Sequence, residues 1–475
     1  MWVILIVAAY FLLLMAVARL TAGKADNHTF FRGERRSPWW AVAFGMLGAS
    51  MSGVTFVSVP GMVVGAQMTY LQMCLGFLPG YLLVAFVLLP LYYRMNLTSI
   101  YTYLAHRFDA TSYTTGAAFF LLSKMAGASV RLYLVCLILQ TVVFAQWHVP
   151  FALSATLLLV LIWCYTQRGG IRTIVWTDCV QTLVMLAALV LIIRAVLAAQ
   201  GWGMAEAVHA IGQSPLSRVT EWDMASPRYF WKQFLSGIFI VIVMTGLDQD
   251  MMQKNLTCRT LRQAQLNMVV NGTLYLPANL LFLCLGVLLV LFAGQHGISL
   301  PARSDEMLPF LCSGGYLGQT ALVCFTVGIV AAAFSSADSA YTALTTSMCV
   351  DILKRPDDQR LRRRVHVGIM LLSLVFIILF DVLNQTSVID AVYQIASYTY
   401  GPLLGLFAFG MFTNRQPRRA LVPYICLAAP LTCWLLSVVT ARVWEYHFGY
   451  ELLMLNGLLV FAGLWLSAAG KKKVS

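Results

Sequence analysis

Apolar runs of about twenty residues recur from one end of the chain to the other, and each is long enough to cross a bilayer as a helix. The composition supports this interpretation, because 60% of the 475 residues are hydrophobic and 11% are charged. About a quarter of the residues in a soluble domain carry a charge. The sequence therefore predicts an all-α membrane protein with a single transmembrane domain over residues 1–475.

About thirteen spans are expected, and each boundary is set by the end of an apolar run. They lie near residues 2–20, 39–66, 69–93, 112–143, 147–166, 171–198, 229–252, 266–295, 316–347, 366–384, 387–412, 420–444 and 449–469. The first run lacks the basic start and the cleavage site of a signal peptide, so we expect a retained extra helix. A core over about 39–412 and C-terminal helices over about 420–469 complete the domain.

The net charge of +13 comes largely from basic residues in short loops, as in membrane proteins. One side of the predicted topology holds clusters such as Arg35-Arg36, Arg362 to Arg364 and Lys471 to Lys473, whereas the other side holds few basic residues. Cytoplasmic loops carry such an excess. We therefore expect the N-terminus outside and the C-terminus in the cytoplasm, and the bilayer, not nucleic acid, as the partner of these charges.

Two spans contain signals that break a helix. The second span carries Gly48, Gly53 and Pro60, and the seventh carries Thr245-Gly246 directly before Asp248. Irregular backbone at membrane depth is tolerated where it lines a cavity or is buried in protein. Two broken spans five apart are what an inverted repeat of two five-helix halves would place at its binding site.

The ninth span crowds hydroxyls and a carboxylate into one turn, with Ser335, Ser336, Asp338 and Ser339. A carboxylate in hydrocarbon is costly, so it should face a partner or a cavity. Hydroxyl, carbonyl and carboxylate oxygens suit a hard cation such as sodium. The alternative is that the serines bond back to carbonyls of the preceding turn and serve only helix packing.

Several segments in order resemble the sodium:solute symporter family, whose members have a LeuT-type fold. They are Pro38-Trp39-Trp40 with Gly48 to Gly53, Thr98-Ser99 with Arg107-Phe108, Gly169-Gly170 with Trp176-Thr177-Asp178, Gly246 to Gln249 with Gln253-Lys254, Ala332 to Ser339, and Gly401-Pro402 with Phe412-Thr413. The resemblance covers nearly the whole chain and implies a 5+5 inverted repeat with discontinuous second and seventh spans.

The resemblance also implies where ions bind. A principal sodium site would take the carbonyls of Gly48, Met51 and Ala332 and the hydroxyls of Ser335 and Ser336. A second sodium site, present in some relatives, would fall on Asp178, Ser335, Asp338 and Ser339. Asp338 stands where some relatives have a hydroxyl residue, so the sodium count stays open between one and two. Asp178 alone could instead be a structural hydrogen-bond acceptor.

Solute-binding residues are expected around the broken second span. They are Ser50, Ser52, Thr55, Gln72, Phe77 and Arg131. Lys124 and Arg131 are seven residues apart in the fourth span and share one helix face. Arg131 would hold a solute carboxylate, as the corresponding arginine does in sialic-acid members of the family. Alternatively it forms a salt bridge with Asp248 or Asp390.

We therefore expect a sodium-coupled symporter of a bacterial inner membrane that imports a small polar solute by alternating access. The second and third spans contain no acidic residue of the kind that binds sugar hydroxyls, which favours an anionic solute such as a sialic acid. The alternatives are a sugar or amino-acid symporter and a proton-coupled carrier. The sequence shows no nucleophile with a base and no metal cluster, so we expect no enzyme, and it indicates no obligatory protein partner.

Overall fold

The computed structural model describes residues 2–21, 30–31, 37–144, 147–383 and 388–468. The helices are α1 (Trp2–Thr21), α3 (Trp39–Ser50), α4 (Gly53–Ala66), α5 (Tyr70–Leu83), α6 (Leu89–Arg94), α7 (Thr102–Arg107), α8 (Ala110–Leu139), α9 (Phe151–Gln200), α10 (Met204–Gln213), α11 (Phe230–Val241), α12 (Gln249–Asn255), α13 (Leu261–Gln295), α14 (Met307–Ser313), α15 (Gly318–Ser347), α16 (Gln359–Leu383), α17 (Val388–Thr399), α18 (Gly401–Phe412), α19 (Val422–Val443) and α20 (Leu452–Ser467). Short π-helical turns continue four of them, at Val84–Leu88, Gln140–Phe144, Ile242–Gly246 and Met348–Ile352.

The helices reproduce the predicted spans one by one. Seven continuous helices have the length and apolar character of a membrane span, and three bent pairs of helices have them jointly. Three shorter apolar helices, Leu5–Thr21, Phe151–Gln167 and Leu452–Ser467, fill the remaining positions. Several basic residues used for the expected topology, among them Arg35, Arg36 and Lys471 to Lys473, lie outside the described residues.

The fifth and sixth spans meet at a kink within α9. Gly170 has φ = 52°, a left-handed conformation that glycine adopts without strain. The backbone of Phe30 lies where a side chain at position 170 would begin, so a larger residue would collide with it. The paired glycines of this segment thus mark the boundary between two spans.

Both expected breaks are present. The second span bends by 56° between α3 and α4, and the seventh bends by 68° between the π-helical turn Ile242–Gly246 and α12. The eleventh span, expected as one continuous helix over 387–412, also bends, by 44° between α17 and α18. Gly401-Pro402 begins α18 there, and a proline at the start of a helix cannot extend the preceding one.

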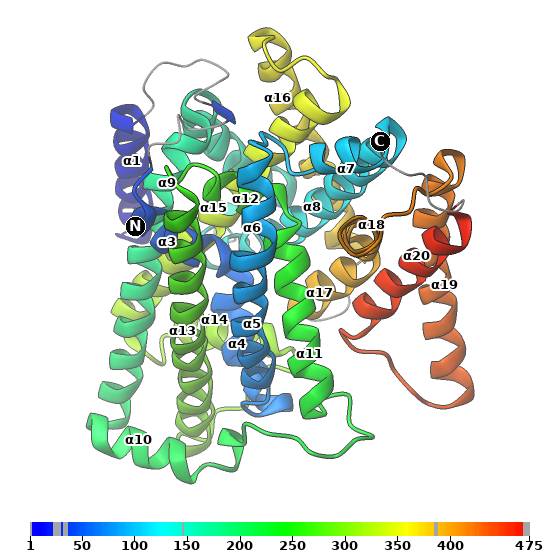
Figure 1. Ribbon diagram of the computed structural model, residues 1–475. Coiled ribbons are helices and arrows are strands. Elements are labelled where there is room, and N and C mark those ends of the chain that lie inside the picture. The colour runs from blue at the N-terminus through cyan, green and yellow to red at the C-terminus, as the bar shows by residue number, and fades with distance from the viewer. Residues whose placement is uncertain (1, 22–29, 32–36, 145–146, 384–387, 469–475) are drawn as a thin grey trace.

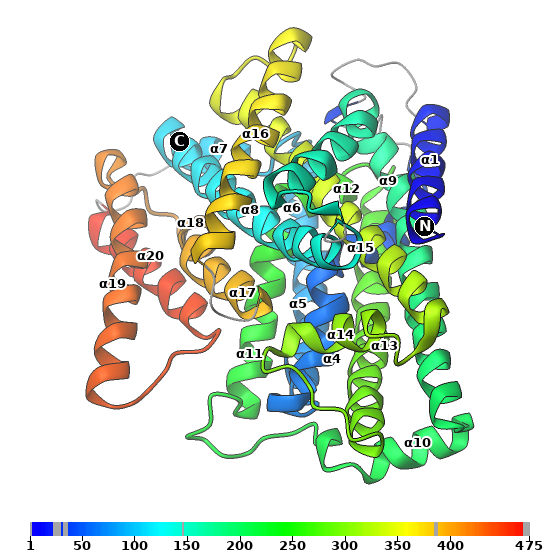
Figure 2. The same ribbon diagram turned by 180° about the vertical axis from the view of Figure 1, so that it is seen from behind.

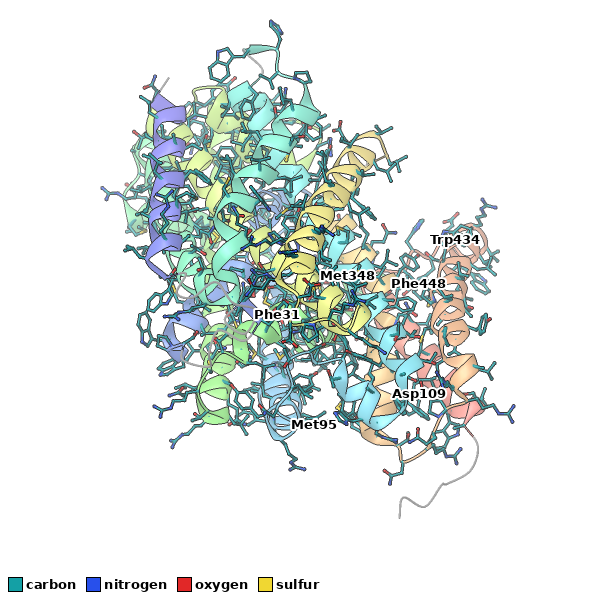
Figure 3. The ribbon with its side chains drawn as sticks, turned by 90° about the horizontal axis from the view of Figure 1, so that it is seen from above. Phe31, Met95, Asp109, Met348, Trp434 and Phe448 are labelled. Carbon is teal, nitrogen blue, oxygen red and sulfur yellow. The ribbon has the colours of Figure 1, made fainter. Side chains whose placement is uncertain are left out.

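The core of the molecule forms around α15. This helix packs against α9, α8, α4, α3 and α12, and every residue from Gly328 to Ser347 is buried. In contrast, α19 and α20 lie at the edge farthest from α1, where Trp434 marks the outer face of α19 (Figures 1 and 3). The view from behind shows the same arrangement, with α10 lying across one end of the long helices (Figure 2). The polar segment of the ninth span is therefore the most enclosed part of the protein.

Candidate functional site

A central cavity of about 80 Å³ lies beside the break of the second span. Ser50, Ser52 and Thr55 line it from the end of α3 and the start of α4. Phe77 of α5 and Arg131 of α8 line it from two other helices. The structure therefore brings together five of the six residues predicted to bind the solute.

The sixth residue, Gln72, does not line the cavity. Its amide nitrogen donates to the carbonyl of Arg228 at 3.1 Å, and its amide oxygen accepts from the backbone N–H of Glu221 at 3.0 Å. Gln72 therefore secures the segment before α11. Gln72 and Phe77 are five residues apart on α5, so their side chains lie on different faces of the helix.

Four tyrosines that the sequence did not single out also line the cavity. They are Tyr81, Tyr275, Tyr393 and Tyr400. They come from α5, α13 and the eleventh span, and nothing in their spacing distinguishes them from ordinary packing residues. The hydroxyls of Tyr70 and Tyr393 hydrogen-bond at 2.9 Å. Tyr70 also lines an outer cavity of about 430 Å³, so this pair lies between the two cavities.

The two cations of α8 have different surroundings. The Lys124 ammonium lies 3.1 Å from Asp248 Oδ2 and 2.7 Å from Asp250 Oδ2, and all three side chains are buried. The Arg131 guanidinium, half-buried, makes no hydrogen bond or ion pair with any residue that the structure describes. A cation at this depth normally has a partner. Arg131 is therefore open to an anion that enters the cavity.

The two acids considered as partners for Arg131 are engaged elsewhere. Asp248 pairs with Lys124, accepts from the Tyr400 hydroxyl at 2.6 Å, and caps α12 by accepting from the N–H of Asp250 at 2.9 Å. Asp390 accepts from the Tyr450 hydroxyl at 2.6 Å. Neither acid forms the salt bridge with Arg131 that was considered as the alternative.

The predicted principal sodium site lies where α3 ends. The last four carbonyls of a helix have no partner further along it, and Gly48 belongs to this set because α3 ends at Ser50. Met51, fully buried, leaves the helix with φ −90° and ψ 91°. Among the described residues no donor reaches the carbonyl of Gly48 or Met51. These oxygens are free to bind a cation.

The other predicted ligands come from α15. Ser336 donates to the carbonyl of Ala333 at 3.1 Å and lies 3.3 Å from that of Ala332, which is the back-bonding considered as the alternative. A hydroxyl engaged in this way keeps lone pairs for a cation. Ser335 instead donates to Asp178 Oδ1 at 2.8 Å.

Helix α9 connects the two groups of ligands. A side chain at Gly45 would begin 2.9 Å from Cβ of Asp178, and one at Gly48 would collide with the Thr182 hydroxyl. At the start of α4, Gly53 lies against Ile329 of α15. The broken second span therefore packs on α9 beside Asp178 and Thr182, and on α15 at Ile329.

The residues of the predicted second sodium site are dispersed among different partners. Asp178 Oδ2 lies 2.7 Å from the ammonium of Lys254. Ser339 lies 3.4 Å from Asp250 Oδ2 and donates to the carbonyl of Ser335 at 3.0 Å. Asp338 accepts from the hydroxyl of Tyr165 at 3.0 Å. A lysine side chain, which the sequence did not place here, thus reaches Asp178.

Comparison with known proteins agrees with this architecture. The family model described as the sodium:solute symporter family matches residues 30–422. The chain belongs to this family. Its members are transporters, so the symporter is not an enzyme, and sodium is its coupling ion.

Among related proteins, the sodium/sialic acid symporter SiaT of Proteus mirabilis is 24% identical over 413 residues, covering 81% of this symporter and 79% of SiaT. The sodium/sialic acid symporter NanT of Aliivibrio fischeri is 24% identical over 462 residues, covering 92% and 88%. The human sodium/iodide cotransporter is 27% identical over 407 residues, covering 82% of this chain and only 62% of that protein.

The fold matches that of a solved Na⁺-coupled sialic acid symporter in a substrate-bound, outward-open state, with a TM-score of 0.83 at 20% identity over 99% of both chains. Mhp1, a nucleobase-cation-symport-1 family transporter, matches with a TM-score of 0.60 at 13% identity, covering 92% of this chain and 94% of Mhp1. These likenesses confirm the expected LeuT-type helical fold with discontinuous second and seventh spans.

Proposed function

We propose that this symporter imports a small organic anion of the sialic-acid or carboxylate class together with sodium. The observation that carries this proposal is the Arg131 guanidinium, which lines the central cavity without a partner among the described residues. A guanidinium binds a carboxylate through two parallel hydrogen bonds, so it selects for this group.

The names of several relatives agree with an anionic solute. They name iodide, sialic acid and monocarboxylates as transported species, and each of these is an anion at neutral pH. The hydroxyls of Ser50, Ser52 and Thr55 in the same cavity would hydrogen-bond further oxygens of the solute. The Ser50 hydroxyl is buried without a partner, as expected of a group that awaits a ligand.

Sodium would bind first at the principal site formed by Gly48, Met51, Ala332, Ser335 and Ser336. An ion there joins the broken second span to α15, which completes the wall of the cavity that holds Ser50 and Ser52. Loss of the ion on the low-sodium side would loosen this contact and release the solute. A tenfold sodium gradient supplies about 1.4 kcal/mol for each ion that enters.

We further propose that the protein lies in a bacterial inner membrane with its N-terminus outside and its C-terminus in the cytoplasm. The excess of lysine and arginine in alternate loops supports this orientation. Helix α10, which follows the sixth span, and the start of α16, which follows the ninth, lie at opposite ends of the molecule, as this topology requires (Figure 1).

Uptake into proteoliposomes tests the proposal. Purified protein under an inward sodium gradient should accumulate labelled N-acetylneuraminate or labelled pyruvate, and substitution of sodium by choline should abolish uptake. Arg131→Ala should lower the kcat/KM of uptake roughly 10- to 150-fold, because a hydrogen bond to a charged group contributes about 1.5–3 kcal/mol. Arg194→Ala serves as the matched control, since Arg194 is exposed on the outer half of α9.

Two results would contradict the proposal. Sodium-dependent uptake of neutral sugars or amino acids only, with no effect of Arg131→Ala, would indicate the other solute classes. Uptake that follows a proton gradient and ignores sodium would indicate a proton-coupled carrier.

A further inference from the structure

A line of buried charges connects the central cavity with α15. It begins at Lys124, whose ammonium lies 2.7 Å from Asp250 Oδ2. Asp250 Oδ1 lies 3.9 Å from the ammonium of Lys254, and that ammonium lies 2.7 Å from Asp178 Oδ2. Asp178 Oδ1 accepts a hydrogen bond from Ser335 at 2.8 Å. Four side chains of alternating charge thus join α8, α12 and α9 to a predicted ligand of sodium.

Lys254 contacts Asp178, one of the residues assigned from sequence to a second sodium ion. Asp178 on α9 is its nearest carboxylate, and Ser335 and Ser339 on α15 hydrogen-bond to Asp178 and Asp250, the two acids that it faces. The Lys254 side chain is 1% exposed and that of Asp178 is 0% exposed. The carboxylates of Asp178 and Asp250, 2.7 and 3.9 Å from the ammonium, favour its charged form.

An ammonium and a sodium ion carry the same charge and use the same oxygens, so they compete for one position. A sodium ion at Asp178 would have to displace Lys254, and the displaced ammonium would lose its 2.7 Å contact and keep the more distant Asp250, 3.9 Å away. Removing one partner of a buried ion pair is strongly unfavourable because the remaining charge is uncompensated. Because the lysine is part of the chain, its contact with Asp178 also does not require an ion to be brought from solution.

We propose that Lys254 is a tethered cation that permanently holds the second-cation position, so that a single sodium ion accompanies each solute molecule. This inference rests on the proposed function as a sodium symporter and fixes its stoichiometry. With a solute of one negative charge the cycle moves no net charge. The sodium gradient alone then drives accumulation, and a tenfold gradient supports a tenfold solute gradient.

Counting bound sodium in the absence of any solute tests this directly. The number of ²²Na⁺ ions bound at saturation is measured on the purified protein, with choline keeping the ionic strength constant. Wild-type protein should bind one ion per chain. Lys254→Arg keeps the charge and should also give one. Lys254→Met leaves Asp178 without its cation and should give two. Because no solute is present, failure to transport an anion would not affect this count.

A wild-type count of two would overturn the proposal, as would a folded Lys254→Met protein that still binds one ion. If Lys254→Met does not fold, the double replacement Asp178→Asn with Lys254→Met removes both members of the pair together and leaves no unpaired charge. That protein should bind one ion, equal to wild type. A loss of one ion relative to wild type would show that a sodium ion occupied Asp178 after all.

Discussion

The second and seventh spans both break, yet the polar groups at the two breaks have different surroundings. At the seventh span, Tyr92 donates to the carbonyl of Gly246 and Tyr101 to that of Leu247, each at 2.9 Å. Asp248 then caps α12 and pairs with Lys124. The protein itself thus supplies partners for the carbonyls of Gly246 and Leu247 and for the carboxylate of Asp248.

The break of the second span has no such partners among the described residues. It contains no charged side chain, the carbonyls of Gly48 and Met51 accept no hydrogen bond, and the Ser50 hydroxyl is buried alone. Buried polar groups without partners are rare and costly. The difference indicates that the seventh-span break is a fixed part of the scaffold, and it supports the proposal that ligands complete the second-span break.

The largest expected effect comes from Lys124→Met, which leaves Asp248 and Asp250 facing each other in a buried site. Removing one partner of a buried ion pair costs about 3–5 kcal/mol. We expect the yield of monodisperse protein in detergent to fall and the melting temperature to drop sharply, as size-exclusion chromatography and thermal denaturation would show.

Arg131→Met is the matched control, because Arg131 lies on the same helix and lines the same cavity but has no partner among the described residues. Its melting temperature should stay close to that of wild type. Equal destabilisation by both variants would contradict the distinction between a paired and an open cation.

Ser336→Ala tests the proposed sodium site at the break of the second span. Loss of one contact to a charged group costs about 1.5–3 kcal/mol, so the sodium affinity should fall roughly 10- to 150-fold. The sodium dependence of uptake gives this value, and membrane insertion should be unchanged. Thr326→Ala removes a buried hydroxyl that bonds back to Leu322 on the same helix and should leave sodium affinity unaltered. Unchanged sodium affinity in Ser336→Ala would refute the site assignment.

Gly48→Ala probes the packing of the same break against α9. The added methyl group would collide with the Thr182 hydroxyl, and overpacking of this kind costs about 1–3 kcal/mol. We expect weaker ²²Na⁺ binding, because α3 must shift away from Asp178 and Thr182. Adding Thr182→Ala should restore part of the binding; absence of any rescue would show that the effect arises elsewhere.

Tyr400→Phe should have the smallest effect. It removes the hydroxyl that donates to Asp248 at 2.6 Å, but Lys124 and the N–H of Asp250 still contact this carboxylate. A single hydrogen bond contributes about 0.5–1.5 kcal/mol. Thermal denaturation should show a modest decrease; a loss as large as that of Lys124→Met would mean that the seventh-span break depends on one donor.

The fold was largely predictable because hydrophobic length and helix-breaking residues are local signals. The apolar runs located the spans, and Gly48 to Gly53 and Thr245-Gly246 located two breaks that the structure confirms. The bend of the eleventh span was missed. Gly401-Pro402 is compatible either with a gentle kink or with a break between two helices. Packing against the rest of the protein decides which of the two forms.

The site was predictable only where the chain itself concentrates polar groups. Ser335, Ser336 and the hydroxyls near Ser50 stand out in apolar helices, and Arg131 stands out as a charge within an apolar span. The environment of Lys254 was not predictable, because its partner Asp178 is far away in sequence and a lysine near a span end is usually interfacial. Gln72 was assigned to the cavity because a span sequence does not reveal which face turns inward.

Salt reaches exposed charges but not those of Lys124 and Lys254, whose side chains are 5% and 1% exposed. The Debye length falls from about 8 Å at 0.15 M ionic strength to about 3 Å at 1 M, which screens surface pairs and leaves buried pairs nearly untouched. The pair of Arg218 and Glu221, with the arginine side chain 50% exposed, belongs to the first group. A sodium titration over this range therefore reports ion occupancy at the core, while ionic-strength effects stay confined to the loops.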